Sequence, residues 1–94
     1  MGNNHVYILT NYNKTTLYVG VTTDLRQRLG DHTSGKSEFS SRYNCKYLVY
    51  YEHFPHLKNA IDREKQLKRW NRAKKEALIA TLNPNWDFLN EQFI

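Results

Sequence analysis

The first part of the chain alternates apolar and polar side chains with the two-residue period of a β-strand. Residues 5–10 (HVYILT) and residues 16–22 (TLYVGVT) each predict a strand, and the polar stretch NYNKT at 11–15 predicts the turn between them. We therefore expect an antiparallel hairpin over residues 5–22.

The pattern then changes to the three- and four-residue spacing of a helix and back again. A helix is expected to run to about Thr33 after a cap at Thr23 or Asp24, and Asp24 with Gln27 resembles a capping box. A serine-rich loop follows at 34–44. The near-continuous apolar and aromatic run CKYLVYYEHF at 45–54 predicts a third strand.

The remainder of the chain predicts helices. A long helical pattern starts after Pro55 and continues through NRAKKEALIATL at 71–82, with a break expected at Trp70–Asn71 and an end at Asn83–Pro84. Apolar residues of the last segment are expected to pack on the body: Trp86, Leu89 and Phe93.

The order β-β-α-β-α-α predicts a small α+β fold, in which helices flank a three-stranded antiparallel sheet. A chain of 94 residues is long enough for one domain, which we place over 1–94. The 39% hydrophobic and 14% aromatic content is that of a globular protein. The 14 Lys and Arg against 9 Asp and Glu give a net charge of +5, which suits either a polyanionic partner or a solvated basic surface.

The single cysteine, Cys45, rules out an internal disulfide, and its apolar strand predicts a buried small hydrophobe. The sequence has no Cys/His pattern typical of a zinc site. The N-terminal stretch MGNNHVYIL predicts neither a signal peptide nor a membrane span. We expect a cytoplasmic protein with no membrane partner.

Two charged residues fall on apolar helix stripes. Arg28 shares a stripe with Leu25, Leu29 and His32. Glu64 shares a stripe with Leu57, Ala60, Ile61 and Leu67. A buried unpaired charge costs several kcal/mol, on the order of the effective desolvation penalty, so each must have a partner, reach water at the edge of its stripe, or face a cleft.

The cleft interpretation would use the polar face of the second strand. Alternation places Leu17, Val19 and Val21 on one face of that strand and Tyr18 and Gly20 on the other. A glycine beside a tyrosine removes a side chain at a point where a ligand could approach the backbone.

Four short motifs in the same order resemble the GIY-YIG nuclease domain. They are VYIL at 6–9, LYVG at 17–20, Arg28 ten residues after Tyr18, and Glu64 within AIDREKQLKRW. The stretches TDLxxRLxxH and EKQLKxW, and the Asn-Pro followed by Trp, are similar to small stand-alone bacterial members of the YhbQ/YazA type.

The resemblance implies hydrolysis of DNA phosphodiester bonds with one Mg²⁺ or Mn²⁺ ion, in DNA repair or recombination and on substrates that include branched or single-stranded DNA. It implies that Glu64 binds the metal and that Arg28 clamps the phosphate. One of Tyr7 and Tyr18 would orient or deprotonate the attacking water, and the choice stays open. His32 would relay a proton or bind a phosphate.

Further residues are expected to bind the substrate. They are Gly20, Thr22, Lys36, Lys65, Lys68 and Arg69. For the lysines and arginine, the alternative is a helix face that is merely solvated. The aromatic residues Tyr47, Tyr50, Tyr51, Trp70 and Trp86 are expected in the core rather than stacked on bases.

One position departs from the family pattern. Many members carry a lysine directly after the second triplet, where this chain has Val21. This departure favours an alternative function, a nucleic-acid-binding module that cleaves weakly or not at all, and a basic structural protein of RNA complexes is a third hypothesis. Members also often have a late asparagine in the site, for which Asn71 and Asn83 are the candidates.

Overall fold

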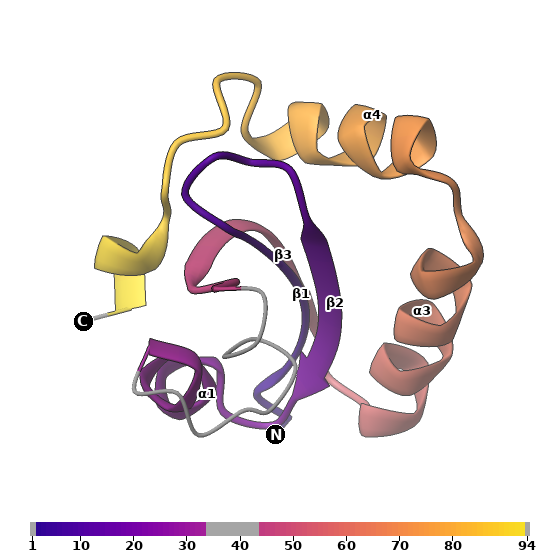
Figure 1. Cartoon of the computed structure of the whole chain (residues 1–94). Helices are drawn as coiled ribbons and strands as arrows, with labels where there is room; N and C mark the ends of the chain where they lie inside the picture. The colour runs from indigo at the N-terminus through magenta and orange to yellow at the C-terminus, as the bar shows by residue number, and fades with distance from the viewer. Residues whose placement is uncertain (1, 34–43, 94) are drawn as a thin grey trace.

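The computed structural model describes residues 2–33 and 44–93, and their arrangement is drawn in Figure 1. Three strands and four helical segments follow one another along the chain. They are β1 (Asn4–Thr10), β2 (Leu17–Thr22), α1 (Leu25–Thr33), β3 (Tyr47–Phe54), α3 (Leu57–Arg69), α4 (Arg72–Leu82) and the 3₁₀ helix η1 (Asn90–Phe93). The predicted α+β class and element order are confirmed, and η1 is an addition to them.

The strands form one antiparallel sheet in the order β2-β1-β3. Tyr7 of the central strand lies opposite Gly20 on one side and Tyr51 on the other. The pairing of β1 with β3 is irregular between Ile8 and Leu9, whereas β1 and β2 pair without a shift. The hairpin expected from the sequence is therefore confirmed, with β2 at an edge of the sheet.

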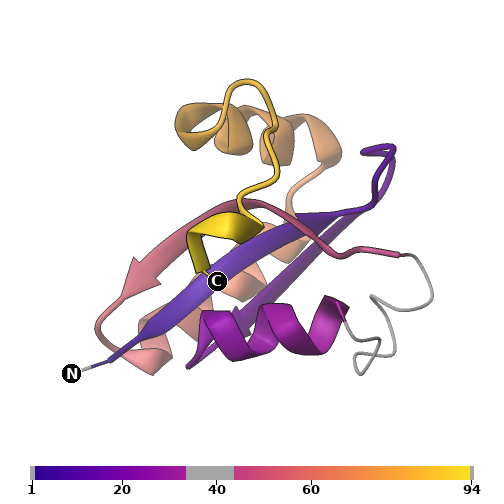
Figure 2. The same ribbon diagram turned by 90° about the vertical axis from the view of Figure 1, so that its left-hand side faces the viewer.

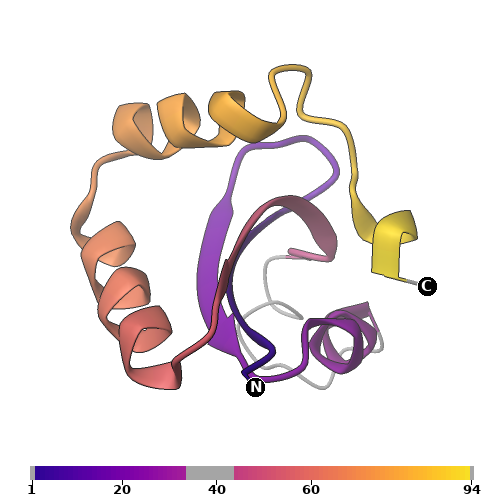
Figure 3. The same cartoon turned by 180° about the vertical axis from the view of Figure 1, so that it is seen from behind.

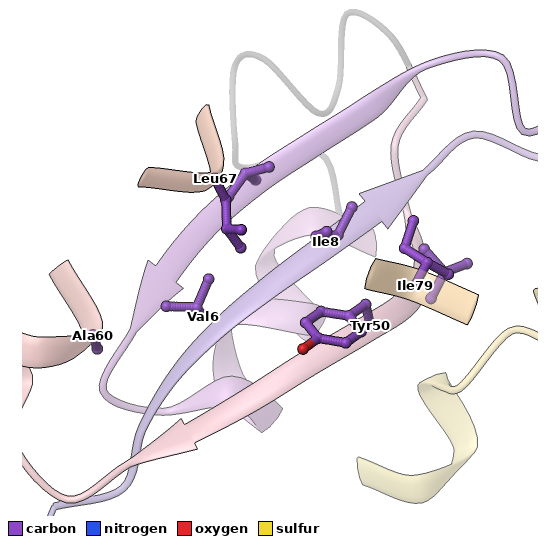
Figure 4. Close-up of a cluster of buried hydrophobic side chains, with 8 residues drawn as sticks. Val6, Ile8, Tyr50, Ala60, Leu67 and Ile79 are labelled. Carbon is purple, nitrogen blue, oxygen red and sulfur yellow. The ribbon is translucent and has the colours of Figure 1, made fainter. Parts of the chain in front are cut away.

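One face of the sheet, which we call the α3 face, is covered by α3 and α4 (Figures 1 and 3). Its core contains Val6, Ile8, Val19, Val49 and Tyr50 from the strands, and Ala60, Leu67 and Ile79 from the helices (Figure 4). Trp70 and Trp86 pack against this core, as the sequence predicts. Burial of these aliphatic side chains is the main force holding the two long helices on the sheet.

The opposite face, which we call the α1 face, is covered by α1 and the C-terminal η1 (Figure 2). Its buried cluster consists of Tyr7, Leu9, Leu25, Leu29, Cys45 and Leu48, with Leu89 and Phe93 packed against it. Cys45 is fully buried, which confirms its predicted place in the core. Leu89 N donates to the Leu48 carbonyl at 2.8 Å, so the last segment is tied to β3 by its backbone.

Local side-chain contacts explain where the helices begin and end. Asp24 Oδ1 accepts a hydrogen bond from Gln27 N at 3.2 Å, which is the predicted N-terminal cap of α1. At the predicted break, Trp70 is extended and Asn71 caps α4 by accepting from Lys74 N at 2.9 Å. Within the described ranges, no helix has the length and apolar character needed to cross a bilayer.

Candidate functional site

The centre of the candidate site is Tyr7, whose side chain crosses the sheet surface toward α1. Its hydroxyl forms a hydrogen bond with His32 Nε2 at 2.9 Å, and both side chains are buried. A Cβ atom at position 20 would lie 2.4 Å from Tyr7 Cζ and Oη. Only glycine therefore lets the ring of Tyr7 pass over β2 to reach His32.

This packing corrects the sequence interpretation of Gly20. The space that the missing side chain leaves is filled by Tyr7 and is not left open for a ligand backbone. Its predicted substrate contact stays a prediction, while its packing role is a finding of the structure.

Tyr18 completes a group of three rings with Tyr7 and His32. Its ring centroid lies 5.3 Å from that of His32 and 6.3 Å from that of Tyr7, and the Tyr7 and His32 centroids are 5.7 Å apart. Tyr18 is half-buried, whereas Tyr7 is 1% exposed. Of the two phenols, Tyr18 is therefore the one that a ligand can reach from solvent.

Arg28 lies one helical turn before His32 on α1 and is exposed. The sequence places it on the inward stripe, but Leu25, Leu29 and His32 fill that stripe and leave Arg28 at its rim. Its charge nevertheless contributes to the pKa of both His32 and Tyr7, so the guanidinium lies within electrostatic range of both. Beside it is a polar depression of about 120 Å³ lined by Thr22, Thr23, Asp24, Gln27, Arg28 and Asp31.

Glu64 approaches the same site from α3. Its side chain is 15% exposed, and its Oε2 lies 2.9 Å from Lys68 Nζ, one turn later in the helix. Lys68 is thus a charged partner for Glu64, one of the outcomes that the sequence left open for this residue. The charge of Glu64 raises the pKa of Tyr7, which shows that the carboxylate lies within electrostatic range of the three rings.

Burial sets the protonation states of the central pair. Removal from water, aided by the nearby Arg28 charge, lowers the pKa of His32 to about 4. Removal from water also raises the pKa of Tyr7 far above its ordinary value, and Tyr18 and Glu64 add to that rise. At neutral pH, a neutral imidazole and a protonated phenol therefore share the hydrogen bond, and His32 Nδ1 has no hydrogen-bond partner among the described residues.

The predicted basic residues of α3 separate into two groups. Lys68 lines a groove of about 240 Å³ beside the edge strand, together with Leu17, Tyr18, Val19 and Lys75. Lys65 and Arg69 instead line a separate hollow of about 320 Å³ with Asp62, Gln66 and Trp70. The structure thus brings Lys68 next to Tyr18, and it adds Lys75 of α4 to the same groove.

Thr22 and Lys36 are the two remaining residues that the sequence predicts to contact the substrate. The Thr22 hydroxyl accepts from Asp24 N at 3.0 Å and donates to the Asp24 carbonyl at 3.2 Å, so it holds the turn between β2 and α1. Lys36 falls outside the described residues.

The two candidate asparagines both have structural partners. Asn71 caps α4. Asn83 is buried and donates to the carbonyls of Val49 at 3.1 Å and Asp87 at 2.8 Å, so it joins the end of α4 to β3 and to the following loop.

A polar network on the α3 face, which has no signature in the sequence pattern, joins α3 to β3 next to Glu64. Arg63 donates to both carboxylate oxygens of Glu52 at 2.9 Å, and Tyr50 donates to the same carboxylate. Although burial opposes it, these hydrogen bonds hold the pKa of Glu52 below its usual value. This bidentate pair fastens α3 to β3 at the residue before Glu64.

The donor set limits which metal this site suits. Within the described ranges, no group of three or more His, Cys, Asp or Glu side chains gathers in one place. Glu64 therefore offers one carboxylate, near the phenols of Tyr7 and Tyr18. A single hard oxygen ligand fits Mg²⁺ or Mn²⁺, ions that keep waters and bind substrate phosphate, and it does not fit a structural zinc site.

Comparisons with known proteins identify the family to which the chain belongs. Residues 3–77 match the family described as the GIY-YIG catalytic domain. A UPF0213 protein of Streptococcus pyogenes serotype M3 is 42% identical over 79 residues, which cover 82% of this chain and 85% of that protein. One from Syntrophus aciditrophicus is 39% identical over 87 residues, covering 84% of this chain and 92% of that protein.

A solved structure also matches the fold. The solution NMR structure of the UPF0213 protein BH0048 from Bacillus halodurans superposes with a TM-score of 0.59 at 32% identity, and the match covers 89% of each chain. The GIY-YIG domain belongs to a nuclease superfamily and implies a nucleic-acid substrate in general terms. The chain belongs to the GIY-YIG domain family.

Proposed function

We propose that this chain is a divalent-metal-dependent DNA endonuclease whose active site contains Tyr7, Tyr18, Arg28, His32 and Glu64. The observation that carries the proposal is the convergence of these residues from β1, β2, α1 and α3 around one hydrogen-bonded Tyr7–His32 pair. An exposed guanidinium and a partly buried carboxylate on either side of phenol groups match the needs of phosphodiester hydrolysis.

The charged residues have separate roles in this proposal. Arg28 is exposed, so its planar guanidinium can donate two hydrogen bonds to the scissile phosphate and stabilise the charge that develops there. Glu64 would hold one Mg²⁺ or Mn²⁺ ion, which when bound polarises the phosphate and stabilises the leaving oxygen. The Arg63–Glu52 pair anchors α3, the helix that carries Glu64, to β3.

The two tyrosines also differ in role. Tyr7 is buried, keeps its proton at neutral pH and is bound to His32, so we assign it to positioning. Tyr18 is more accessible and lines the groove with Lys68 and Lys75, so we assign it to orienting the attacking water. These two ammonium groups place positive charge beside Tyr18 although the strand itself carries Val21.

The proposal also names a DNA substrate and a cellular role. We assign the enzyme to branched or single-stranded DNA in cytoplasmic DNA repair or recombination. Support comes from the net charge of +5 and from the lysine-lined groove that continues from the site along β2.

The test is cleavage of supercoiled plasmid, branched DNA and single-stranded DNA with Mg²⁺, with Mn²⁺ and with EDTA. Glu64→Gln and Arg28→Ala should each lose at least about 100-fold in rate, the magnitude typical of removing a group that stabilises transition-state charge. The matched controls are Asp62→Asn and Arg26→Ala, exposed residues of the same two helices, which should keep the wild-type rate. Cleavage that survives in both site variants would refute the assignment.

A second candidate function is a nucleic-acid-binding module without efficient cleavage. The observations that favour it are Val21 and the Glu64–Lys68 ion pair, which engages the carboxylate needed for the metal. Salt-dependent binding by the wild-type protein, with no cleavage in either metal, would support this function over the first.

A further inference from the structure

The turn between β1 and β2 holds an aromatic side chain in solvent. Tyr12 is 72% exposed, more than any other large hydrophobic residue that the structure describes. The turn beneath it is nevertheless well ordered by hydrogen bonds: Asn11 Oδ1 accepts from Thr15 N at 2.8 Å and from Thr16 N at 3.1 Å. The Asn11 amide also donates to Thr15 Oγ1 at 2.7 Å.

Helix α4 braces the same turn from outside the hairpin. The guanidinium of Arg72 donates to the carbonyls of Thr15 and Lys14, both at 2.8 Å. Lys14 itself has a φ of 59°, the left-handed conformation that closes the turn. A rigid turn loses little conformational freedom when a ligand binds to it, so the exposed ring of Tyr12 is preorganised for contact.

Two further rings lie beside Tyr12, and we call Tyr12, Tyr47 and Phe88 the aromatic turn cluster. The rings of Tyr47 and Phe88 stack with centroids 4.2 Å apart and an interplanar angle of 21°. The centroid of Tyr12 is 6.1 Å from each of them. Lys14 Nζ lies 5.3 Å from the centroid of Phe88.

Packing alone does not account for this arrangement. Tyr47 and Phe88 are half-buried and Phe88 contacts the core of the α3 face, but Tyr12 gains little burial from its neighbours. Lys14 brings one ammonium group to the cluster, where its Nζ lies over the ring of Phe88, while Asp87 adjoins Phe88 in the sequence. Exposed rings with nearby ammonium groups are suited to bases and the phosphates that join them.

We propose that the aromatic turn cluster binds an unpaired nucleotide, with a base stacked on Tyr12 and a phosphate held by Lys14. Base pairs in a duplex stack on one another and hide their faces, so the partner is single-stranded nucleic acid. This inference rests on the proposed function and deepens it by naming the substrate class. Figure 2 shows the turn at the far end of the hairpin from the N terminus, and β2 leads from it to Tyr18.

The test measures binding without cleavage. Wild-type protein in EDTA is titrated into a fluorescent oligothymidine strand at fixed low salt, and anisotropy gives the affinity. Tyr12→Ala should weaken binding about 5- to 100-fold, the range expected from loss of one stacked base, while Tyr12→Phe should stay within about twofold of wild type. Leu82→Ala, which removes another exposed apolar side chain, should bind as the wild type does.

Two further ligands separate stacking from other contacts. A strand of abasic spacers should bind the wild type and Tyr12→Ala equally, because it has phosphates but no bases. A duplex of the same length should also show no difference between them. Lys14→Ala should reduce the salt dependence of oligothymidine binding by about one phosphate contact.

Specific results would overturn the inference. They are wild-type affinity of Tyr12→Ala for oligothymidine, an equal loss on the abasic strand, or an equal loss on the duplex. Because metal is absent, the outcome is independent of the nuclease proposal. A wild-type protein that binds the single strand through Tyr12 but never cleaves DNA would refute the nuclease and leave this inference in place.

Discussion

The two faces of the sheet differ in the kind of side chain that they bury. On the α3 face the fully buried side chains are aliphatic, and the Arg63–Glu52 ion pair, to which the buried Tyr50 donates, is partly exposed. On the α1 face a phenol and an imidazole are buried together in the middle of the cluster. We infer from this difference that the α3 face supplies most of the stability, and that burial of the polar pair makes the α1 face less stabilising.

A cavity in the α3 face should have the largest effect on the free energy of unfolding, and it therefore tests most directly whether this face dominates stability. Leu67→Ala removes a fully buried side chain that packs on the sheet, and it should lower the free energy of unfolding by about 2–5 kcal/mol. Urea unfolding would measure the change, with Lys65→Ala, an exposed neighbour on the same helix, as the control. A loss below about 1 kcal/mol would show that the α3 face does not dominate stability.

The next largest effect should come from pH, and it belongs to the α1 face. The pKa of His32 is about 4 in the folded chain and 6.5 in the unfolded chain, so the unfolded state binds the extra proton first. The stability associated with neutral His32 is therefore full above pH 6.5 and is lost as pH falls toward 4, by up to about 3 kcal/mol at ~1.4 kcal/mol per pKa unit.

The measurement is the free energy of unfolding from pH 7.5 to 4 in the wild type and in His32→Gln. Burial also lowers the pKa of His5, so the wild-type profile contains a second histidine. The difference between the two profiles isolates His32. Parallel profiles would contradict the buried neutral imidazole.

The sequence predicted the parts of this architecture that depend on local pattern. Strand alternation placed Val19 and Tyr18 on opposite faces, and helical spacing directed Leu25 and Leu29 toward the sheet; both agree with the structure. The same spacing placed Arg28 inward, because periodicity alone does not give the width of a buried stripe. Arg28 lies at the rim and is exposed.

Contacts between distant elements could not be predicted in this way. The passage of Tyr7 over Gly20 depends on how two strands pair and where α1 crosses them. The Arg63–Glu52 pair joins α3 to β3 and has no signature in local spacing. The resemblance indicated which residues belong to the site, whereas their hydrogen bonds and protonation states required the fold.

A third prediction uses two glycines of the α1 side. Gly20→Ala places a methyl group against the ring of Tyr7, which must move away from His32, and the strain should cost about 1–3 kcal/mol. Gly30→Ala on α1 meets open space and should be neutral or stabilising by about 0.5–1 kcal/mol. Thermal unfolding would compare them. Equal effects would show that Tyr7 does not need the space at position 20.

Removing one phenol oxygen from each face should change stability least, and its effect on DNA cleavage should distinguish the two faces most clearly. Tyr7→Phe and Tyr50→Phe each remove one phenol oxygen, the first from the hydrogen bond to His32 and the second from the bond to Glu52. Each should cost about 1 kcal/mol, because a hydrogen bond is lost and its partner stays partly desolvated. If the α1 face contains the active site, DNA cleavage per folded molecule should fall only for Tyr7→Phe. In that variant His32 loses the hydrogen bond that holds it beside Tyr7 and Tyr18. Equal losses of cleavage in both variants would mean that the site depends on the whole sheet, and the division of roles between the faces would then be wrong.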